Sequence, residues 1–144
     1  MGDDSPIYKC AGVVLYRDTL GGPEFLLVEN NKQKRFQYSF PKGKRERCET
    51  SIETAIRETR EETGLGSFCY TLDEEVYYIE YIGDHKPHII YYLAKLKGNP
   101  EIKPENSQEI ISYKWVNAEY IECQGDMELT YQRRCILSKV LHNL

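Results

Sequence analysis

The chain has 144 residues, of which 40% are hydrophobic and 29% charged, a balance that predicts one folded domain over residues 1–144 rather than a disordered segment. The net charge of −4 and the pI of about 5.5 argue against nucleic acid as a partner, and the lack of an apolar run of roughly 18 residues argues against a membrane span. Five cysteines without a CxxC spacing predict reduced thiols in the cytoplasm or the nucleus, and we expect a monomer.

The predicted elements begin with a pair of strands. Residues 8–16 (YKCAGVVLY) and 24–29 (EFLLVE) are rich in β-branched and aromatic side chains, and the turn residues DTLGG separate them. The polar segment 30–35 predicts a loop, and the short run FQYSF ends at Pro41. The stretch PKGK that follows predicts a turn, which would bring backbone carbonyls and lysines to the start of a helix.

The helix after this turn carries signals at both ends. Thr50 and Glu53 form the TxxE pattern of a capping box, and Gly64 is a typical C-terminal stop. Between them, residues suited to packing recur at helical spacing: Ile52, Ala55, Ile56 and Thr59.

The second half of the chain predicts three strands and a final helix. Residues 75–81 and 89–97 are rich in tyrosine and isoleucine and are separated by GDHKP, which predicts a hairpin-like pair. Residues 110–116 (IISYKWV) predict another strand, and residues 129–142 have the period of a helix. The order of strands, helix, strands and helix indicates a mixed α/β or α+β sandwich.

Three glutamates crowd one face of the first predicted helix. At about 100° per residue, Glu61 and Glu62 lie roughly 60° and 40° to either side of Glu58. Like charges at this spacing repel one another, and a hard divalent cation removes the conflict. Oxygen-only ligands favour Mg²⁺ or Mn²⁺ over zinc. The alternative is a solvated acidic face on which Arg57 pairs with Glu53 and Glu61.

The segment around this helix resembles a known motif. Residues 43–65, GKRERCETSIETAIRETREETGL, are similar to the Nudix box, GX5EX7REUXEEXGU. All fixed positions match, and Thr59 stands where the family prefers a bulky aliphatic side chain. The resemblance implies the Nudix fold, a mixed β-sheet sandwiched between helices, and hydrolysis of a nucleoside diphosphate that is linked to another group.

The resemblance also implies roles for the residues of the box. Glu58 and Glu62 would bind a cation directly, and Glu61 would be a further ligand or the base that activates water. The carbonyl of Gly43 would complete the ligand set. The implied cofactor is Mg²⁺, with Mn²⁺ as the alternative. Two further residues would pair to hold the loop against the helix: Arg57 and Glu49.

The regions that flank the box resemble one group within this family, the asymmetric diadenosine tetraphosphate hydrolases. PKGK stands where that group has PKGH, YIGDHKPHIIYYLAKLK resembles its lysine–proline strand, and SQEIISYKW keeps the pattern S-x-E-x5-W. In the last stretch, Glu109 matches a glutamate that serves as a metal ligand or as the general base. Glu61 and Glu109 both qualify as the base by position.

The same resemblance implies a surface that binds the substrate. Tyr81 matches a tyrosine that stacks on adenine, although an ordinary outward-facing strand tyrosine is an equal interpretation. His88 replaces a phosphate-binding lysine of the group, and a histidine is only partly charged at neutral pH. The complete set of expected substrate contacts is Lys42, Lys44, Tyr81, Lys86, His88 and Tyr131.

The leading hypothesis is metal-dependent hydrolysis of diadenosine tetraphosphate to ATP and AMP by attack of water on phosphorus. Diphosphoinositol polyphosphate phosphohydrolases also carry PKG or PGG before the box, but they call for a more basic chain. Enzymes that decap mRNA share FPKGK but add a helical domain and a basic surface. The last alternative is a catalytically silent, nucleotide-sensing module, against which stands the intact set Glu58, Glu61, Glu62 and Glu109.

Overall fold

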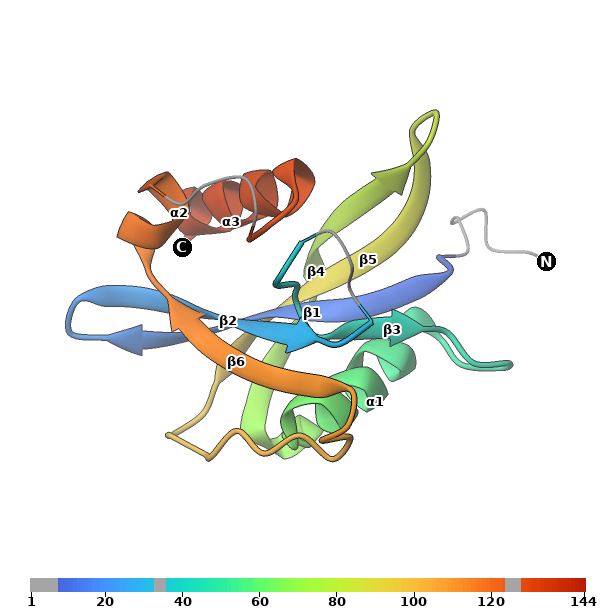
Figure 1. Ribbon diagram of the computed structural model, residues 1–144, viewed down its shortest axis with the longest axis horizontal. Helices are drawn as coiled ribbons and strands as arrows, with labels where there is room; N and C mark the ends of the chain where they lie inside the picture. Colours follow the sequence, from blue (N-terminus) through green and yellow to red (C-terminus); the bar gives the residue numbers. More distant parts are fainter. Residues whose placement is uncertain (1–7, 33–35, 124–127) are drawn as a thin grey trace.

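The chain folds around one mixed β-sheet that lies between helices (Figure 1). The computed structural model describes residues 8–32, 36–123 and 128–144, and within them the sheet has six strands. These strands are β1 (Cys10–Thr19), β2 (Gly22–Asn30), β3 (Lys42–Lys44), β4 (Tyr70–Ile82), β5 (Lys86–Leu96) and β6 (Ile110–Val116). The helical elements are α1 (Ser51–Thr63), the 3-10 turn η1 (Ser67–Cys69), α2 (Ala118–Cys123) and α3 (Tyr131–Asn143).

Strand β1 lies in the middle of the sheet and pairs with three other strands. The strand order is β4-β5-β1-β2-β6, and β3 is attached to β1. β1 runs parallel to β5 and antiparallel to β2 and β3, while β4 and β5 form the expected antiparallel hairpin. The mixed sheet between helices that the sequence predicts is therefore confirmed. In the part of the chain described here, no helix is long and apolar enough to cross a membrane.

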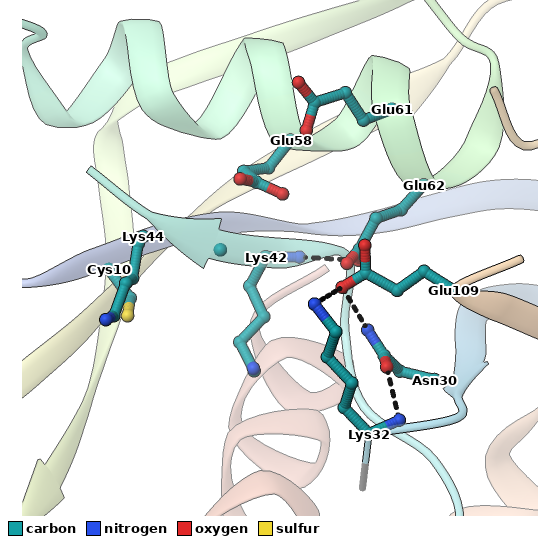
Figure 2. A pocket seen from close by; sticks show the side chains of 10 residues that line it. Cys10, Asn30, Lys32, Lys42, Lys44, Glu58, Glu61, Glu62 and Glu109 are labelled. Atoms are coloured by element: carbon teal, nitrogen blue, oxygen red, sulfur yellow. Dashed lines mark hydrogen bonds and ion pairs between the residues drawn. The ribbon is translucent and has the colours of Figure 1, made fainter. Parts of the chain in front are cut away.

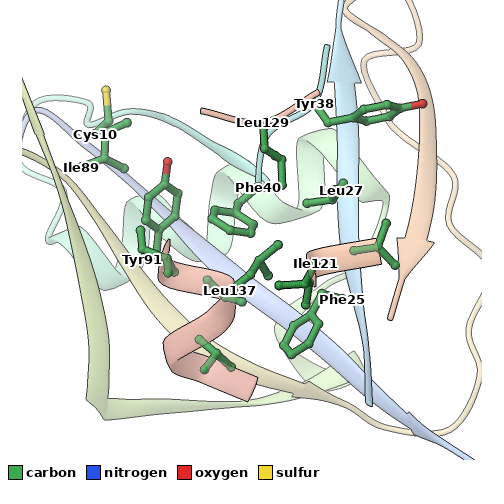
Figure 3. Packing of buried hydrophobic residues seen from close by; sticks show 14 residues of the cluster. Cys10, Phe25, Leu27, Tyr38, Phe40, Ile89, Tyr91, Ile121, Leu129 and Leu137 are labelled. Atoms are coloured by element: carbon green, nitrogen blue, oxygen red, sulfur yellow. The ribbon is translucent and has the colours of Figure 1, made fainter. Parts of the chain in front are cut away.

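The alternation of side chains along β1 builds a separate core on each face of the sheet. Val14 belongs to the core that Leu137 of α3 completes, whereas Leu15 points into the core that Ala55 of α1 completes. Figure 3 shows the first of these clusters, in which Phe40 packs edge-on against Tyr91 with ring centroids 5.0 Å apart. Both faces of the sheet are thus buried, and α1 is fixed against one of them.

Helix α1 has the ends that the sequence predicts, and its C-terminal end also anchors a distant loop. The Thr50 side chain accepts from the Glu53 N–H, the Glu53 side chain accepts from the Thr50 N–H, and Gly64 is left-handed with φ of 79°. The backbone carbonyl of Glu61 accepts from Glu105 at 3.0 Å and from Asn106 at 3.2 Å. These bonds hold the loop before β6 against α1.

The main departure from the sequence prediction concerns PKGK, which forms strand β3 instead of a turn. The Val13 N–H donates to the Pro41 carbonyl at 3.1 Å, and a Cβ at Gly12 would lie only 2.1 Å from that same oxygen. The missing side chain at Gly12 therefore lets this segment join β1. The short helix α2 is a second departure, because no periodic pattern marks it.

Candidate active site

A pocket of about 450 Å³ opens between α1, β3 and the loop that precedes β6 (Figure 2). The strand β3 supplies its floor, α1 supplies carboxylates from one side, and the loop supplies one from the other. Its lining includes the four carboxylates expected to bind a cation or to act as the base, together with the lysines on either side of Gly43. The complete lining is Cys10, Asn30, Lys32, Lys42, Gly43, Lys44, Glu58, Glu61, Glu62 and Glu109.

Glu62 is the most deeply buried acid of this pocket, with 5% of its surface exposed. Burial raises the pKa of its carboxyl to about 8, and the charges of Glu58 and Glu109 act in the same direction. The backbone N–H of Lys42 donates to its Oε1 at 3.1 Å and opposes this rise. A buried acid with a single hydrogen bond and two acidic neighbours is suited to a cation.

Arg57 holds the box loop against α1. Its guanidinium donates to both carboxylate oxygens of Glu49, at 2.6 and 3.0 Å, and to the Lys44 carbonyl at 2.8 Å. These hydrogen bonds lower the pKa of the Glu49 carboxyl to about 2. The expected pairing of Arg57 with Glu49 is therefore present. The backbone of β3 is attached to the same arginine.

The same guanidinium also reaches two of the pocket acids. Its Nη1 donates to Glu58 Oε1 at 2.8 Å and lies 3.3 Å from Glu61 Oε2. Burial raises the pKa of the Glu58 carboxyl, the hydrogen bond from Arg57 lowers it, and the Glu61 charge raises it again. The Arg57–Glu61 pair of the solvated-face interpretation is therefore present, while Glu53 is used in the capping box.

The donor set of the pocket fits a hard divalent cation, although its side chains are not gathered around one point. Among the described residues, no three carboxylate, imidazole or thiol groups lie close enough together to hold a metal ion as they stand. The four glutamates supply oxygen donors, and each glutamate has three rotatable side-chain bonds with which to approach an ion. Gly43 provides the space in which this can happen, because a Cβ there would lie 2.1 Å from Glu58 Cδ.

Gly43→Ala is expected to weaken the binding of a divalent cation by about 10-fold or more. The added methyl group would displace the Glu58 carboxylate, which is the far end of a flexible side chain, so the fold should survive. Calorimetric titration with Mg²⁺ measures the affinity and thermal unfolding measures the stability. Gly21→Ala is the control, since a Cβ there meets only Thr19 Oγ1 at 3.9 Å. Equal Mg²⁺ affinity in both variants would contradict the expectation.

The remaining sequence-predicted residues lie apart from this pocket. Tyr81 and Lys86 belong to the outer end of the β4–β5 hairpin, His88 sits at a register shift in β5, and Tyr131 begins α3. The two tyrosines are 42% and 69% exposed. Gln132 links their elements, since its carboxamide accepts from the Tyr81 N–H and donates to the Tyr81 carbonyl, both at 2.8 Å. The elements that carry the two tyrosines therefore meet at Gln132, and neither tyrosine lines the acidic pocket.

Sequence reasoning missed three residues that line the pocket: Cys10, Asn30 and Lys32. Cys10 resembles any core cysteine in the sequence, and burial raises the pKa of its thiol. Asn30 and Lys32 both fall within the polar segment 30–35 that predicts a loop. The signal in the sequence is the asparagine at position 30, since asparagine favours an Asx-turn. In the structure the Asn30 side chain accepts the N–H of Lys32, two residues later, as in such a turn.

Fold, box and pocket together define a class of hydrolase, and comparison with known proteins agrees. A family model described as NUDIX domain matches residues 8–135. The chain therefore belongs to the Nudix hydrolase family, as its box predicts.

Within this family, the chain is similar to proteins that share one named activity. A bis(5'-nucleosyl)-tetraphosphatase (asymmetrical) of Mus musculus is 38% identical over 120 residues, which are 77% of this chain and 80% of that protein. The enzyme of the same name from Caenorhabditis elegans is 32% identical over 115 residues, 78% and 81% of the two chains. The crystal structure of a C. elegans Ap4A hydrolase binary complex matches with a TM-score of 0.77 and 27% identity, and covers 96% of this chain and 100% of that one.

Proposed function

We propose that this protein hydrolyses dinucleoside polyphosphates with the aid of Mg²⁺, and that it converts diadenosine tetraphosphate to ATP and AMP. The observation that carries the proposal is the pocket in which four glutamates and three lysines meet. Relatives that bear the name of this activity support the choice of substrate. The negative charge of a polyphosphate must be neutralised by cations. The acids of this pocket can bind a metal cation, and its lysines carry positive charge themselves.

Glu58, Glu62 and the Gly43 carbonyl would hold the cation, with Glu61 or Glu109 as a further ligand. When bound, Mg²⁺ would neutralise phosphate charge and lower the pKa of a bound water. The pocket acid that does not bind the cation would take the proton from the attacking water, which requires a heavy-atom distance of about 2.6–3.2 Å. Arg57 would fix the position of Glu58 relative to the β3 backbone, since it donates to both.

The substrate would extend from the pocket towards the hairpin and α3. The Lys42 and Lys44 side chains line the pocket and would bind the oxygens of the phosphate under attack. Lys86, with His88 when it is protonated, would bind the distal phosphates. The exposed rings of Tyr81 and Tyr131 would stack on a base, a contact worth about 1–3 kcal/mol per base.

The test is a substrate panel with purified protein and Mg²⁺: diadenosine tetraphosphate, a diphosphoinositol polyphosphate, capped RNA and ordinary nucleoside triphosphates. Ion-exchange chromatography separates the products. ATP plus AMP from diadenosine tetraphosphate, faster than any other turnover, is the expected result. In ¹⁸O-labelled water, the label in only one of the two nucleotides identifies the phosphorus attacked. Preferred turnover of the inositol pyrophosphate would overturn the nucleotide assignment, and no turnover at all would favour the silent module.

Glu109→Gln separates the two roles open to Glu109. If Glu109 is the general base, kcat is expected to fall by about 10²–10⁴-fold while Mg²⁺ affinity changes little. If it is a ligand, Mg²⁺ affinity falls along with kcat. Steady-state kinetics at saturating Mg²⁺ and calorimetric Mg²⁺ titration distinguish these outcomes. Glu61→Gln, measured in the same way, shows which of the two acids remains as the base.

A further inference from the structure

Two asparagines from distant parts of the chain hold the carboxylate of Glu109. Asn30, the last residue of β2, donates its Nδ2 to Glu109 Oε1 at 3.0 Å, and Asn106 donates its Nδ2 to Oε2 at 2.7 Å. Lys32 Nζ lies 3.6 Å from Oε1. Both carboxylate oxygens are therefore held, and Figure 2 shows the carboxylate beside that of Glu62.

The two asparagines are themselves held by their side-chain oxygens. Asn30 Oδ1 accepts the backbone N–H of Lys32 at 2.8 Å, and Asn106 Oδ1 accepts the backbone N–H of Glu109 at 3.2 Å. Each carboxamide thus uses its oxygen to fix a turn and its nitrogen to hold Glu109. Because the Asn106 N–H donates to the Glu61 carbonyl of α1, this arrangement also links the loop to the helix that carries the other acids.

We propose that Asn30 and Asn106 are positioning residues for the hydrolysis proposed above, and that they act by keeping the Glu109 carboxylate in the pocket beside Glu62. The inference rests on that proposed function. A carboxylate has about four lone-pair sites, so two amide N–H groups leave it sites for a water or a cation. Since a misplacement of about 1 Å can cost roughly 10²-fold in rate, loss of either donor is costly.

Asn30→Asp and Asn106→Asp separate the two duties of each side chain. Each aspartate keeps an oxygen that can accept the same backbone N–H, but it has no N–H to donate and it repels Glu109. We expect kcat for diadenosine tetraphosphate to fall about 10–100-fold in each variant, with KM and the melting temperature close to those of the wild type.

The matched control is Asn117→Asp. The Asn117 side-chain oxygen accepts the Tyr120 N–H at 3.1 Å at the start of α2, so the substitution adds the same charge and keeps a local hydrogen bond from a backbone N–H to the side chain, away from the pocket. It should leave kcat unchanged. A fall of kcat in this control equal to that in the other two variants would overturn the proposal, because charge alone would then explain the loss.

The decisive comparison repeats both substitutions in the Glu109→Gln background. If the asparagines act through Glu109, they should lower kcat little further there, whereas independent effects would add. Full additional losses in that background overturn the proposal, and so does an unchanged kcat in the wild-type background.

A crystal structure of the Asn30→Asp, Asn106→Asp double variant gives a readout that needs no turnover. The Glu109 carboxylate is expected to turn away from Glu62, and a carboxylate that stays in place would overturn the positioning role. Failure of the proposed function is distinguishable, because the wild type itself would then release no ATP and AMP. The structural comparison would still decide whether the asparagines hold Glu109.

Discussion

Replacing Glu62 by glutamine is expected to lower kcat/KM by at least about 100-fold. Mutation of residues that only orient a metal ligand already lowers metal affinity or activity by roughly 10–100-fold. The substituted amide can still accept the Lys42 N–H, so the geometry of β3 is retained. What is lost is the ability of the most buried acid of the pocket to ionise and bind a cation. Steady-state kinetics over a range of Mg²⁺ concentrations measure the effect. Glu101→Gln, at an exposed position, should leave the rate unchanged.

The same substitution is expected to change how stability depends on pH. The pKa of the Glu62 carboxyl is raised to about 8 in the folded protein, so from about pH 4.5 to pH 8 the folded chain keeps a proton that the unfolded chain has lost. Without a divalent cation, the free energy of unfolding should therefore fall as pH rises through this window, at up to about 1.4 kcal/mol per pH unit.

Chemical denaturation in a chelating buffer at several pH values tests this dependence. In Glu62→Gln the slope should become much shallower, with only the smaller contribution of Glu58 remaining, whose pKa is raised in the same direction. Added Mg²⁺ should stabilise the wild type most at high pH, because metal binding requires the ionised carboxylate and releases its proton. A wild-type slope that equals that of the variant would refute the assignment of a buried, protonated Glu62.

Arg57→Ala is the second substitution with a large expected effect, and it acts first on stability. The Arg57 side chain is 17% exposed and pairs with Glu49, Glu58 and Glu61. Removing one partner of a buried ion pair costs about 3–5 kcal/mol, because the remaining charges lose their compensation. Urea denaturation at pH 7 measures the loss. Activity under conditions in which the variant is folded should also fall about 10–100-fold.

Arg60→Ala is the matched control on the same helix. Its side chain is 54% exposed and pairs only loosely with Glu105, at 3.6 Å, so a loss of about 0–1 kcal/mol is expected. Arg57→Ala should also remove most of the stability that the ionised Glu49 contributes. With its pKa lowered to about 2 by Arg57, the Glu49 carboxyl stabilises the wild-type fold above about pH 4.5, and this contribution is lost as pH falls towards 2. Similar losses in the two arginine variants would contradict the role of Arg57.

Local signals made the central part of the site predictable. The capping box, the stop at Gly64 and the spacing of Glu58, Glu61 and Glu62 all depend on residues within one helix, and the structure places these features as expected. Glu109 lies in the same pocket even though it is 47 positions beyond Glu62 in the sequence. Its inclusion depended on resemblance to known enzymes, since no local rule connects a loop to a helix so far away.

What could not be predicted depends on contacts between distant segments. The strand β3 forms because Gly12 allows the Pro41 carbonyl to approach β1. Nothing in the local sequence around either residue indicates that the two segments pair. The hold of Asn30 on Glu109 spans 79 positions. The relation of Tyr81 to α3 depends on the side chain of Gln132, which substitutes for a neighbouring strand at the edge of the sheet.

The two faces of the sheet separate two kinds of change that this protein could tolerate. The acids of α1 are anchored on one face through the core that contains Ala55, whereas α3 packs on the other face through Leu137. Substitutions around Tyr131 or in the outer hairpin can therefore alter the surface on which we propose that a base stacks, without repacking the helix that carries the acids. An engineer who wishes to change the preferred leaving nucleotide should vary α3 and the hairpin and keep residues 43–65 intact.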